Sequence, residues 1–177
     1  MRNIKILSKA EAIQYYNTNT KDIYIIVSIS SLNEEDTLYF KNYNKSNNCR
    51  GLIRLSFNDL EHDLNDSILA PRQGDFCGLK AFIDTFKEDK DIDTIVVHCD
   101  AGISRSSALG AIIAQYLGLN EFNLVWNNDK YIPNERVYRL ASNEFKLKLC
   151  EAQLNFYKGI KKQLLEEMEL PLDILIR

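Results

Sequence analysis

The chain has 177 residues, of which 45% are hydrophobic and 27% charged, as in an ordinary folded protein with a sizeable core. Its net charge of −3 favours neither a nucleic-acid partner nor an anionic membrane surface. No apolar run has the length of a membrane span, and the first residues lack the core of a signal peptide. We therefore expect a cytoplasmic protein.

The four cysteines form no C-x-x-C pair, and the chain has only two histidines, His62 and His98. This composition predicts neither a zinc site nor another metal or cofactor site. In a reducing compartment the cysteines are expected to be free thiols. They are Cys49, Cys77, Cys99 and Cys150.

Strand and helix patterns alternate along the chain. Short apolar, β-branched runs predict strands at residues 2–7, 22–30, 51–57 and 94–99. Apolar residues at helical spacing predict helices at about residues 9–17, 76–86, 104–117, 135–141 and 143–168. The alternation predicts an α/β fold with a central, mainly parallel sheet flanked by helices, in a single domain over residues 1–177.

Polar segments and capping residues separate these elements. Residues 33–48 are predicted to be an exposed connection with one helical turn, and residues 58–75 a long loop. Asp75 and Asn134 are predicted N-caps, and Gly118 a helix end. The apolar stripe of the last helix is predicted to pack on the core or to form a dimer face. It consists of Phe145, Leu149, Ala152, Phe156, Ile160 and Leu164.

The segment TIVVHCDAGISRSS joins a buried strand to an apolar helix through a short loop. A strand–loop–helix turn points backbone N–H groups into one concavity, and the helix N-terminus adds positive potential. Gly102 allows the backbone to curl, and Arg105 can hold two oxygens bidentately. The same positive field favours the thiolate form of Cys99. The loop is therefore suited to hold a tetrahedral oxyanion beside a nucleophilic sulfur.

The residues HCDAGISRS (98–106) resemble the signature H-C-x-x-G-x-x-R-[S/T] of cysteine-dependent protein tyrosine phosphatases. The form AGISRS is most similar to the dual-specificity branch and its small microbial relatives. The downstream IPNERVYRL (132–140) is similar to the loop and helix that follow the signature in that branch. The resemblance covers about residues 25–140 and implies the phosphatase fold and activity.

Carried over residue by residue, the resemblance makes Cys99 the nucleophile that forms a phosphocysteine. Arg105 and the loop amides hold the phosphoryl oxygens. Ser106 assists departure of the sulfur in the second step, His98 orients the loop and tunes the thiol, and Asn134 braces the loop through side-chain hydrogen bonds. The residues expected to bind substrate are Asp100, Ala101, Gly102, Ile103, Ser104 and Arg105.

The family also uses an aspartate from a separate upstream loop as general acid and base. Asp59 follows directly after a predicted strand, as in the dual-specificity pattern, and is our choice. Its separation from Cys99 is longer than usual in that branch, so Asp63 remains an alternative.

Structural roles compete with these assignments. Cys99 could be a buried structural thiol, and His98 an ordinary strand histidine. Asp59 could be a helix cap or a solvated loop residue, and Asn134 could cap a helix while bracing the loop.

The predicted function is hydrolysis of phosphotyrosine esters, with phosphoserine and phosphothreonine left open. The acidic side chain of Asp100 argues against highly anionic substrates. The expected partner is a phosphorylated protein or a small phosphoester, without nucleic acid or membrane, and the oligomeric state stays open. Two alternatives are a phosphate-binding interaction module with the same loop and little turnover, and a rhodanese-like sulfurtransferase.

Overall fold

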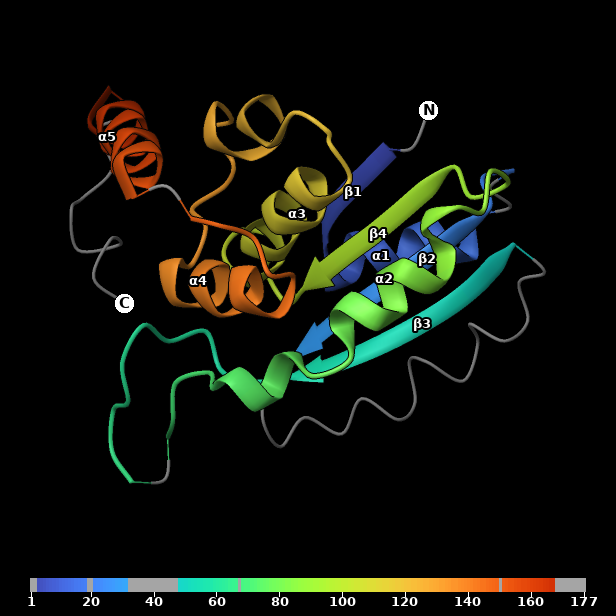
Figure 1. Ribbon diagram of the computed structural model, residues 1–177, viewed down its shortest axis with the longest axis horizontal. Helices are drawn as coiled ribbons and strands as arrows, with labels where there is room; N and C mark the ends of the chain where they lie inside the picture. The colour runs from blue at the N-terminus through green and yellow to red at the C-terminus, as the bar shows by residue number, and fades with distance from the viewer. Residues whose placement is uncertain (1–2, 19–20, 32–47, 67, 150, 168–177) are drawn as a thin grey trace.

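The computed structural model describes residues 3–18, 21–31, 48–66, 68–149 and 151–167. Four strands form one sheet in the order β1-β4-β2-β3, and all neighbouring strands are parallel. Their bounds are Asn3–Ser8 (β1), Tyr24–Ser30 (β2), Cys49–Ser56 (β3) and Thr94–Cys99 (β4). Helices cover both faces of the sheet (Figure 1). The predicted α/β class with a parallel sheet is confirmed, and the predicted connection at residues 33–48 lies outside the described residues except for Asn48.

β4 lies inside the sheet, between β1 and β2, and all six of its residues are buried. Ser8 pairs with Cys99 on one side, and Ser28 pairs with His98 on the other. Because the strands are parallel, their carboxyl ends meet at one edge of the sheet. This is the edge at which open α/β sheets usually bind their ligands.

The two faces of the sheet carry different cores. Tyr24, Ile26 and Val96 form a small cluster on the face covered by α1, Lys9–Asn17. The larger core lies on the opposite face, where α3, Arg105–Tyr116, covers β4 and β1. Side chains in a strand alternate between faces, so Cys99 belongs to the larger core and His98 to the α1 face.

α1 and α3 begin and end close to the predicted positions. Ser8 caps α1 with a capping box, in which its hydroxyl accepts from the Glu11 amide at 3.2 Å. α3 is buried along nearly its whole length, as its apolar sequence predicts. Gly118 ends the segment with a φ of 69°, the left-handed conformation typical of a residue just past a helix.

The start of the helix over β3 was predicted wrongly. α2 spans Leu79–Lys87, and its N-cap is Gly78 in a left-handed conformation, not Asp75. Asp75 instead lies in the 3₁₀ turn η2, Gln73–Phe76, and its carboxylate accepts from the Arg72 amide at 2.7 Å. The Asp75 carboxylate is already hydrogen-bonded within this turn, before α2 begins. Asp75 therefore stabilises η2 and does not cap α2.

The predicted helix over residues 143–168 is interrupted. α4 ends at Glu144 (Glu135–Glu144), Lys146 has a φ of 55°, and α5 begins at Glu151 (Glu151–Glu167). This left-handed residue rotates α5 relative to the predicted stripe.

The buried residues of α5 are therefore different from those predicted. Leu154, Tyr157 and Lys161 are buried, whereas Phe156 is 62% exposed. Tyr157 stacks on Trp126 of η3, Phe122–Trp126, with ring centroids 5.1 Å apart. η3 is a π-helical turn that the sequence pattern did not predict, and it provides the surface on which α5 packs.

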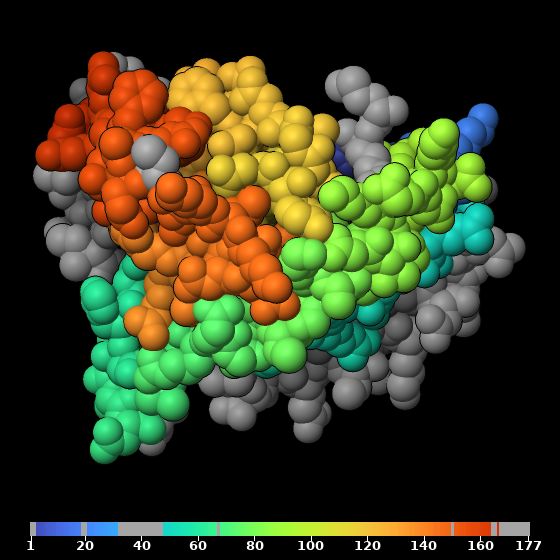
Figure 2. Space-filling model, viewed as in Figure 1, coloured from blue at the N-terminus to red at the C-terminus, as the bar shows by residue number. Residues whose placement is uncertain are grey.

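The loop at residues 58–72 projects beyond the sheet edge, beside the N-terminal end of α4 (Figures 1 and 2). The Glu61 carboxylate accepts from the amides of Glu135 and Arg136 at 2.7 and 3.3 Å. The Arg136 side chain donates to the carbonyls of Pro71 and Glu61 at 2.7 and 3.3 Å. These bonds fix both arms of the loop to α4.

Candidate active site

The candidate nucleophile lies where β4 ends at the sheet edge. Cys99 is the last residue of β4, and α3 begins six residues later at Arg105. The Cys99 Sγ atom lies 3.2 Å from Ser106 Oγ and accepts from the Gly102 amide at 3.3 Å. The thiol is 2% exposed. The sulfur thus contacts a backbone amide of the loop and a hydroxyl in the first turn of α3.

Gly102 is required by the close approach of the loop to the start of α1. It has a φ of 73°, and a Cβ atom built on it would lie 2.4 Å from the Ser8 nitrogen and 2.6 Å from the Leu7 carbonyl carbon. The Lys9 amide donates to the Asp100 carbonyl at 3.1 Å nearby. The junction of β1 and α1 is therefore the rear wall of the loop.

The Arg105 guanidinium is held from several sides. It is 4% exposed, and its Nη1 donates to the Phe57 carbonyl at 2.9 Å and to Ser31 Oγ at 3.1 Å. Its Nη2 donates to the Asp100 carboxylate. The Nε atom has no hydrogen-bond partner among the described residues and lies 3.8 Å from Asp59 Oδ2. The ends of β2 and β3 thus fix the guanidinium beside the loop.

Asp100 has a role that the sequence did not predict. Its carboxylate binds Arg105 and also accepts from Ser31 Oγ at 3.2 Å. The expectation that Asp100 repels highly anionic substrates assumed an unpaired carboxylate. Because Asp100 is paired with Arg105 here, that argument loses its basis.

Asp59 and Asp63 lie in different surroundings. Asp59 Oδ1 accepts from Ser104 Oγ at 2.7 Å and from Asn134 Nδ2 at 3.0 Å, so it lies directly beside the Cys99 loop. Asp63 accepts from the Arg72 side chain at 2.5 Å and from the Ala70 amide at 2.7 Å. The Arg72 contact, together with the amide, lowers the pKa of Asp63 below its usual value. Asp63 is thus bound to residues of its own loop and, among the described residues, forms no hydrogen bond or ion pair with the Cys99 loop.

Asn134 is the N-cap of α4, as predicted, and its Oδ1 accepts from the Val137 amide at 2.9 Å. Its Nδ2 reaches Asp59, not the Cys99 loop. The support for the loop comes from the backbone: the Asn134 and Ile132 amides donate to the carbonyls of Ser104 and Ile103, at 3.4 and 3.1 Å.

His98 lies away from the sulfur. Its buried ring is on the α1 face of the sheet, edge-on to Tyr16 with ring centroids 6.4 Å apart. Cys99 points to the opposite face, into the larger core. His98 therefore packs behind the site.

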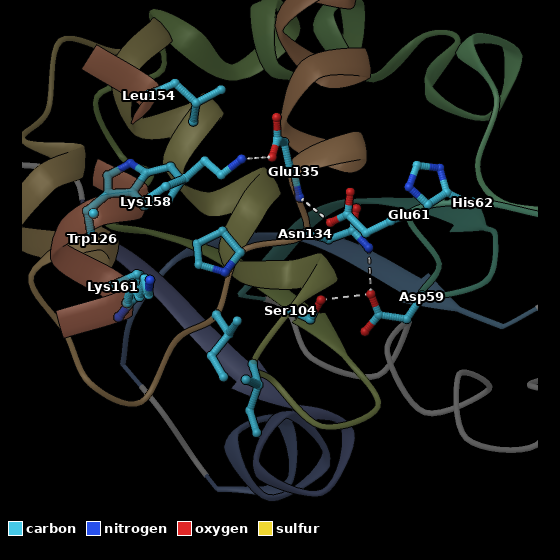
Figure 3. Close-up of a pocket in the computed structure, with 15 residues that line it drawn as sticks. Asp59, Glu61, His62, Ser104, Trp126, Asn134, Glu135, Leu154, Lys158 and Lys161 are labelled. Atoms are coloured by element: carbon cyan, nitrogen blue, oxygen red, sulfur yellow. Dashed lines mark hydrogen bonds and ion pairs between the residues drawn. The ribbon is translucent and has the colours of Figure 1, made fainter. Parts of the chain in front are cut away.

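A pocket of about 720 Å³ adjoins the Cys99 loop (Figure 3). Ile103 and Ser104 line it at the loop, and Asp59 lines it from the long loop. Its other wall comes from α5 and includes Leu154 and Lys161. Ala101 and Ile103 are both exposed, Ile103 to 37%, but only Ile103 lines the pocket.

Sequence reasoning missed three groups at this edge: the Ser31 hydroxyl, the Phe57 carbonyl and the Glu61 carboxylate. Ser31 and Phe57 each directly follow a strand, β2 and β3 respectively. Residues after parallel strands converge at one edge, and this signal could have found both. Nothing in the sequence pattern around Glu61 marks it as the group that docks the long loop on α4.

The described residues contain no cluster of three or more His, Cys, Asp or Glu side chains placed to hold a metal ion. Across the same ranges, no helix combines the length and the apolar character needed to cross a membrane.

Comparison with known proteins shows a similarity at the level of solved structures. No protein-family model matches the chain, and no curated protein matches it. The chain is similar to a crystal structure of PTPMT1 in complex with PI(5)P, with a TM-score of 0.41 and 16% sequence identity. The similarity covers 95% of this chain and 97% of that chain.

Proposed function

We propose that this protein is a phosphatase that hydrolyses phosphotyrosine esters through a phosphocysteine on Cys99. The observation that carries the proposal is the assembly around the Cys99 sulfur at the end of β4. Ser106 Oγ and the Gly102 amide lie 3.2 and 3.3 Å from it, and the buried Arg105 begins α3 beside it. This sulfur lies at the N-terminal end of α3, next to the groups that would bind a phosphoryl group, and is therefore placed to attack its phosphorus.

In the first step the Cys99 thiolate attacks phosphorus, and the bond between phosphorus and the tyrosyl oxygen breaks. Asp59, entering as the carboxylic acid, gives its proton to the departing oxygen. The loop amides and Arg105 hold the three equatorial oxygens as charge spreads over them. Gly102 has a left-handed backbone conformation. Such a residue in a loop can turn successive N–H groups toward one concavity.

In the second step a water attacks the phosphocysteine, and the sulfur–phosphorus bond breaks. The Asp59 carboxylate takes a proton from that water, and Ser106 Oγ donates a hydrogen bond to the departing thiolate. Inorganic phosphate leaves and the thiolate is restored. Asp59 suits this role better than Asp63, because it contacts Ser104 of the loop, whereas Asp63 is held by Arg72.

Asp100 and Ser31 act as positioning residues in this scheme. Both bind the Arg105 guanidinium, and they also bind each other. With both Nη1 hydrogens and one Nη2 hydrogen occupied, the Nε hydrogen and the second Nη2 hydrogen are left to bind two phosphoryl oxygens, and Nε lies on the side of Asp59. The carboxylate thus aims the guanidinium without touching the substrate.

The test compares Cys99→Ser with Cys77→Ser, because Cys77 is an exposed thiol away from the site. We expect the first variant to lose hydrolysis of phosphotyrosyl peptides and aryl phosphates, while the second keeps it. Vanadate should inhibit the wild type, and a chelator should not. Equal activity of both variants contradicts the proposal. Phosphopeptide binding without turnover by the wild type would show a binding module instead.

A further inference from the structure

The pocket beside the Cys99 loop has charges of opposite sign at its two ends. Asp59 and Glu61 lie at the end nearest the loop. Three lysines from α5 line the opposite wall, and Figure 3 shows Lys161 across the pocket from Asp59. The lysines are Lys158, Lys161 and Lys162. Between the two ends lie apolar groups, among them Trp126 and Pro133.

Most of the acidic groups in the pocket are already neutralised. Glu61 accepts from the two amides at the N-terminus of α4. Glu135 is paired with Lys158 at 2.5 Å and with Arg139 at 2.8 Å. These contacts leave Lys161 and Lys162 as the charges that set the sign of the α5 end.

Lys161 is unusual because it is 5% exposed without a carboxylate partner. Its Nζ donates to the Asn128 carbonyl, and within the described ranges no Asp or Glu forms an ion pair with it; Asp129 acts on it only through a longer-range attraction. Loss of hydration on burial lowers the pKa of Lys161 to about 8. Lys162 pairs weakly with Glu166, at 3.8 Å between two exposed side chains. An anion in the pocket would restore to Lys161 the stabilisation that its burial removes.

We propose that the α5 end of this pocket recognises a second anionic group, a carboxylate or a phosphate, on the leaving-group portion of the substrate. The apolar middle would cover the spacer between the two groups. That a phosphoryl group binds at Cys99 is taken from the proposed function. The second anionic group is inferred from the charge distribution of the pocket alone.

The first experiment measures preference during turnover. One set of phosphotyrosyl peptides carries a single aspartate at successive flanking positions, each matched by a peptide with asparagine. A second set pairs a carboxylated aryl phosphate with its carboxamide. We expect the wild type to prefer the charged member of at least one pair by about tenfold in kcat/KM, as one charged contact provides. A preference among the peptides identifies a protein substrate, and one among the aryl phosphates alone a small molecule.

The variants assign that preference to α5. In Lys161→Met with Lys162→Met the ratio of the two kcat/KM values should fall close to one. Lys90→Met is the matched control: Lys90 is exposed before β4, at the other end of that strand from Cys99, and its loss should leave the ratio intact. Melting temperatures of the variants establish that they are folded. A wild type without any charge preference, or a double variant that keeps it, overturns the proposal.

A binding experiment separates this inference from the proposed function. In the Cys99→Ser background, calorimetry should give the same ratio of Kd values between charged and neutral ligands, and the lysine variants should remove it. If the wild type hydrolyses none of the substrates, the proposed function fails while the Kd ratio still decides whether the pocket recognises a second anion. Equal Kd values for all pairs overturn the inference whether or not the enzyme is active.

Discussion

The two loops at the carboxyl edge of the sheet are built in opposite ways. The loop after β4 is short and begins directly after the buried Cys99, and the β1–α1 junction leaves no room for a side chain on its Gly102. The loop after β3 is long and projects into solvent, where Leu64 at its far part is 67% exposed. It is held to α4 by a few hydrogen bonds, those of Glu61 and Arg136.

This difference separates two requirements of the proposed chemistry. The nucleophile and the phosphate-binding groups gain from a backbone that cannot relax, because catalysis depends on donors fixed before the reaction. A general acid must protonate leaving groups of different shapes. A loop that is anchored at its base can hold the acid in position while its far part adopts different conformations. Substitutions that weaken the rigid short loop or the anchored long loop test whether the two loops meet different requirements.

The largest loss is expected when the buried cation of the short loop changes shape. Arg105→Lys keeps the charge but cannot reach Phe57, Ser31 and Asp100 together. We expect kcat/KM for an aryl phosphate to fall by about 10³-fold, the upper range for loss of one transition-state donor. Arg50→Lys, at an exposed position in β3, is the control and should keep full activity. A loss below tenfold in Arg105→Lys would show that the guanidinium does not bind the phosphoryl group.

The next largest effect is expected on stability. Gly102→Ala places a Cβ atom 2.4 Å from the Ser8 nitrogen, in a left-handed backbone conformation. Backbone atoms must move, so we expect a loss of about 3 kcal/mol in the free energy of unfolding, together with the activity. Denaturant unfolding measures the change. Gly74→Ala, where nothing lies within 4 Å of the added Cβ, should cost far less. Similar losses in both variants would contradict the close packing of the short loop.

The acid loop is tested by a matched pair of substitutions. Asp59→Asn should lower kcat by about 10²-fold for substrates with poor leaving groups, and less for good ones, because a good leaving group needs no proton. Asp63→Asn removes a contact to Arg72 and should change kcat by less than about twofold. Leaving-group dependence of kcat across substituted aryl phosphates provides the measurement. If the dependence changed in Asp63→Asn and not in Asp59→Asn, the acid would be assigned to the wrong residue.

A smaller effect is expected from the residues that position Arg105. Asp100→Asn keeps the size of the side chain but removes the negative charge that holds Arg105 Nη2, and we expect kcat/KM to fall by about tenfold. Because Asp100 does not touch the substrate, the pH at which the activity is half-maximal should move little. Asp100→Glu should restore part of the loss. Full activity in Asp100→Asn would show that Ser31 and Phe57 suffice to hold the guanidinium.

The smallest effect concerns Lys161 and the pH dependence of stability. Its pKa is lowered to about 8 when folded, chiefly by burial and despite Asp129, whereas the unfolded value is near 10.5. Between these values the unfolded chain binds more protons, so this lysine makes stability rise with pH. Lys161→Met should therefore stabilise the protein by about 1 kcal/mol at pH 7, and the gain should shrink as pH rises toward 10.5. Urea unfolding at several pH values measures this, and a gain that grew with pH would contradict the buried-cation argument.

Much of the fold could be predicted because its signals are local. The apolar run of β4 and the apolar helix after it are both present where predicted. Asn134 caps α4 because an asparagine before a helical pattern is a strong local signal. The break at Lys146 could not be predicted, because neither glycine nor proline marks it. The predicted core packing of the stripe therefore holds for Phe145 and Leu149, before α5, but not for Phe156 within it.

In the candidate site, too, local contacts could be predicted and long-range contacts could not. The sequence pattern put Cys99, Gly102 and Arg105 in one loop, and their contact follows from short separation along the chain. Ser31 and Phe57 reach Arg105 only through the order of the strands, which no single segment encodes. The pairing of Asp100 with Arg105 also depends on side-chain geometry. Long-range contacts of this kind are the part that a sequence pattern leaves out.

The pairing of β1 with β4 has a consequence for how the protein is made. Residues 3–8 lie beside residues 94–99, and Ser8 is opposite Cys99. On the ribosome, the first strand must therefore wait until more than half of the polypeptide has been synthesised before its partner exists. Closing so large a loop is slow, so the rear wall of the anion cradle is expected to be among the last parts to form. During synthesis, the chain would then carry the Cys99 sulfur before the wall that encloses it has formed.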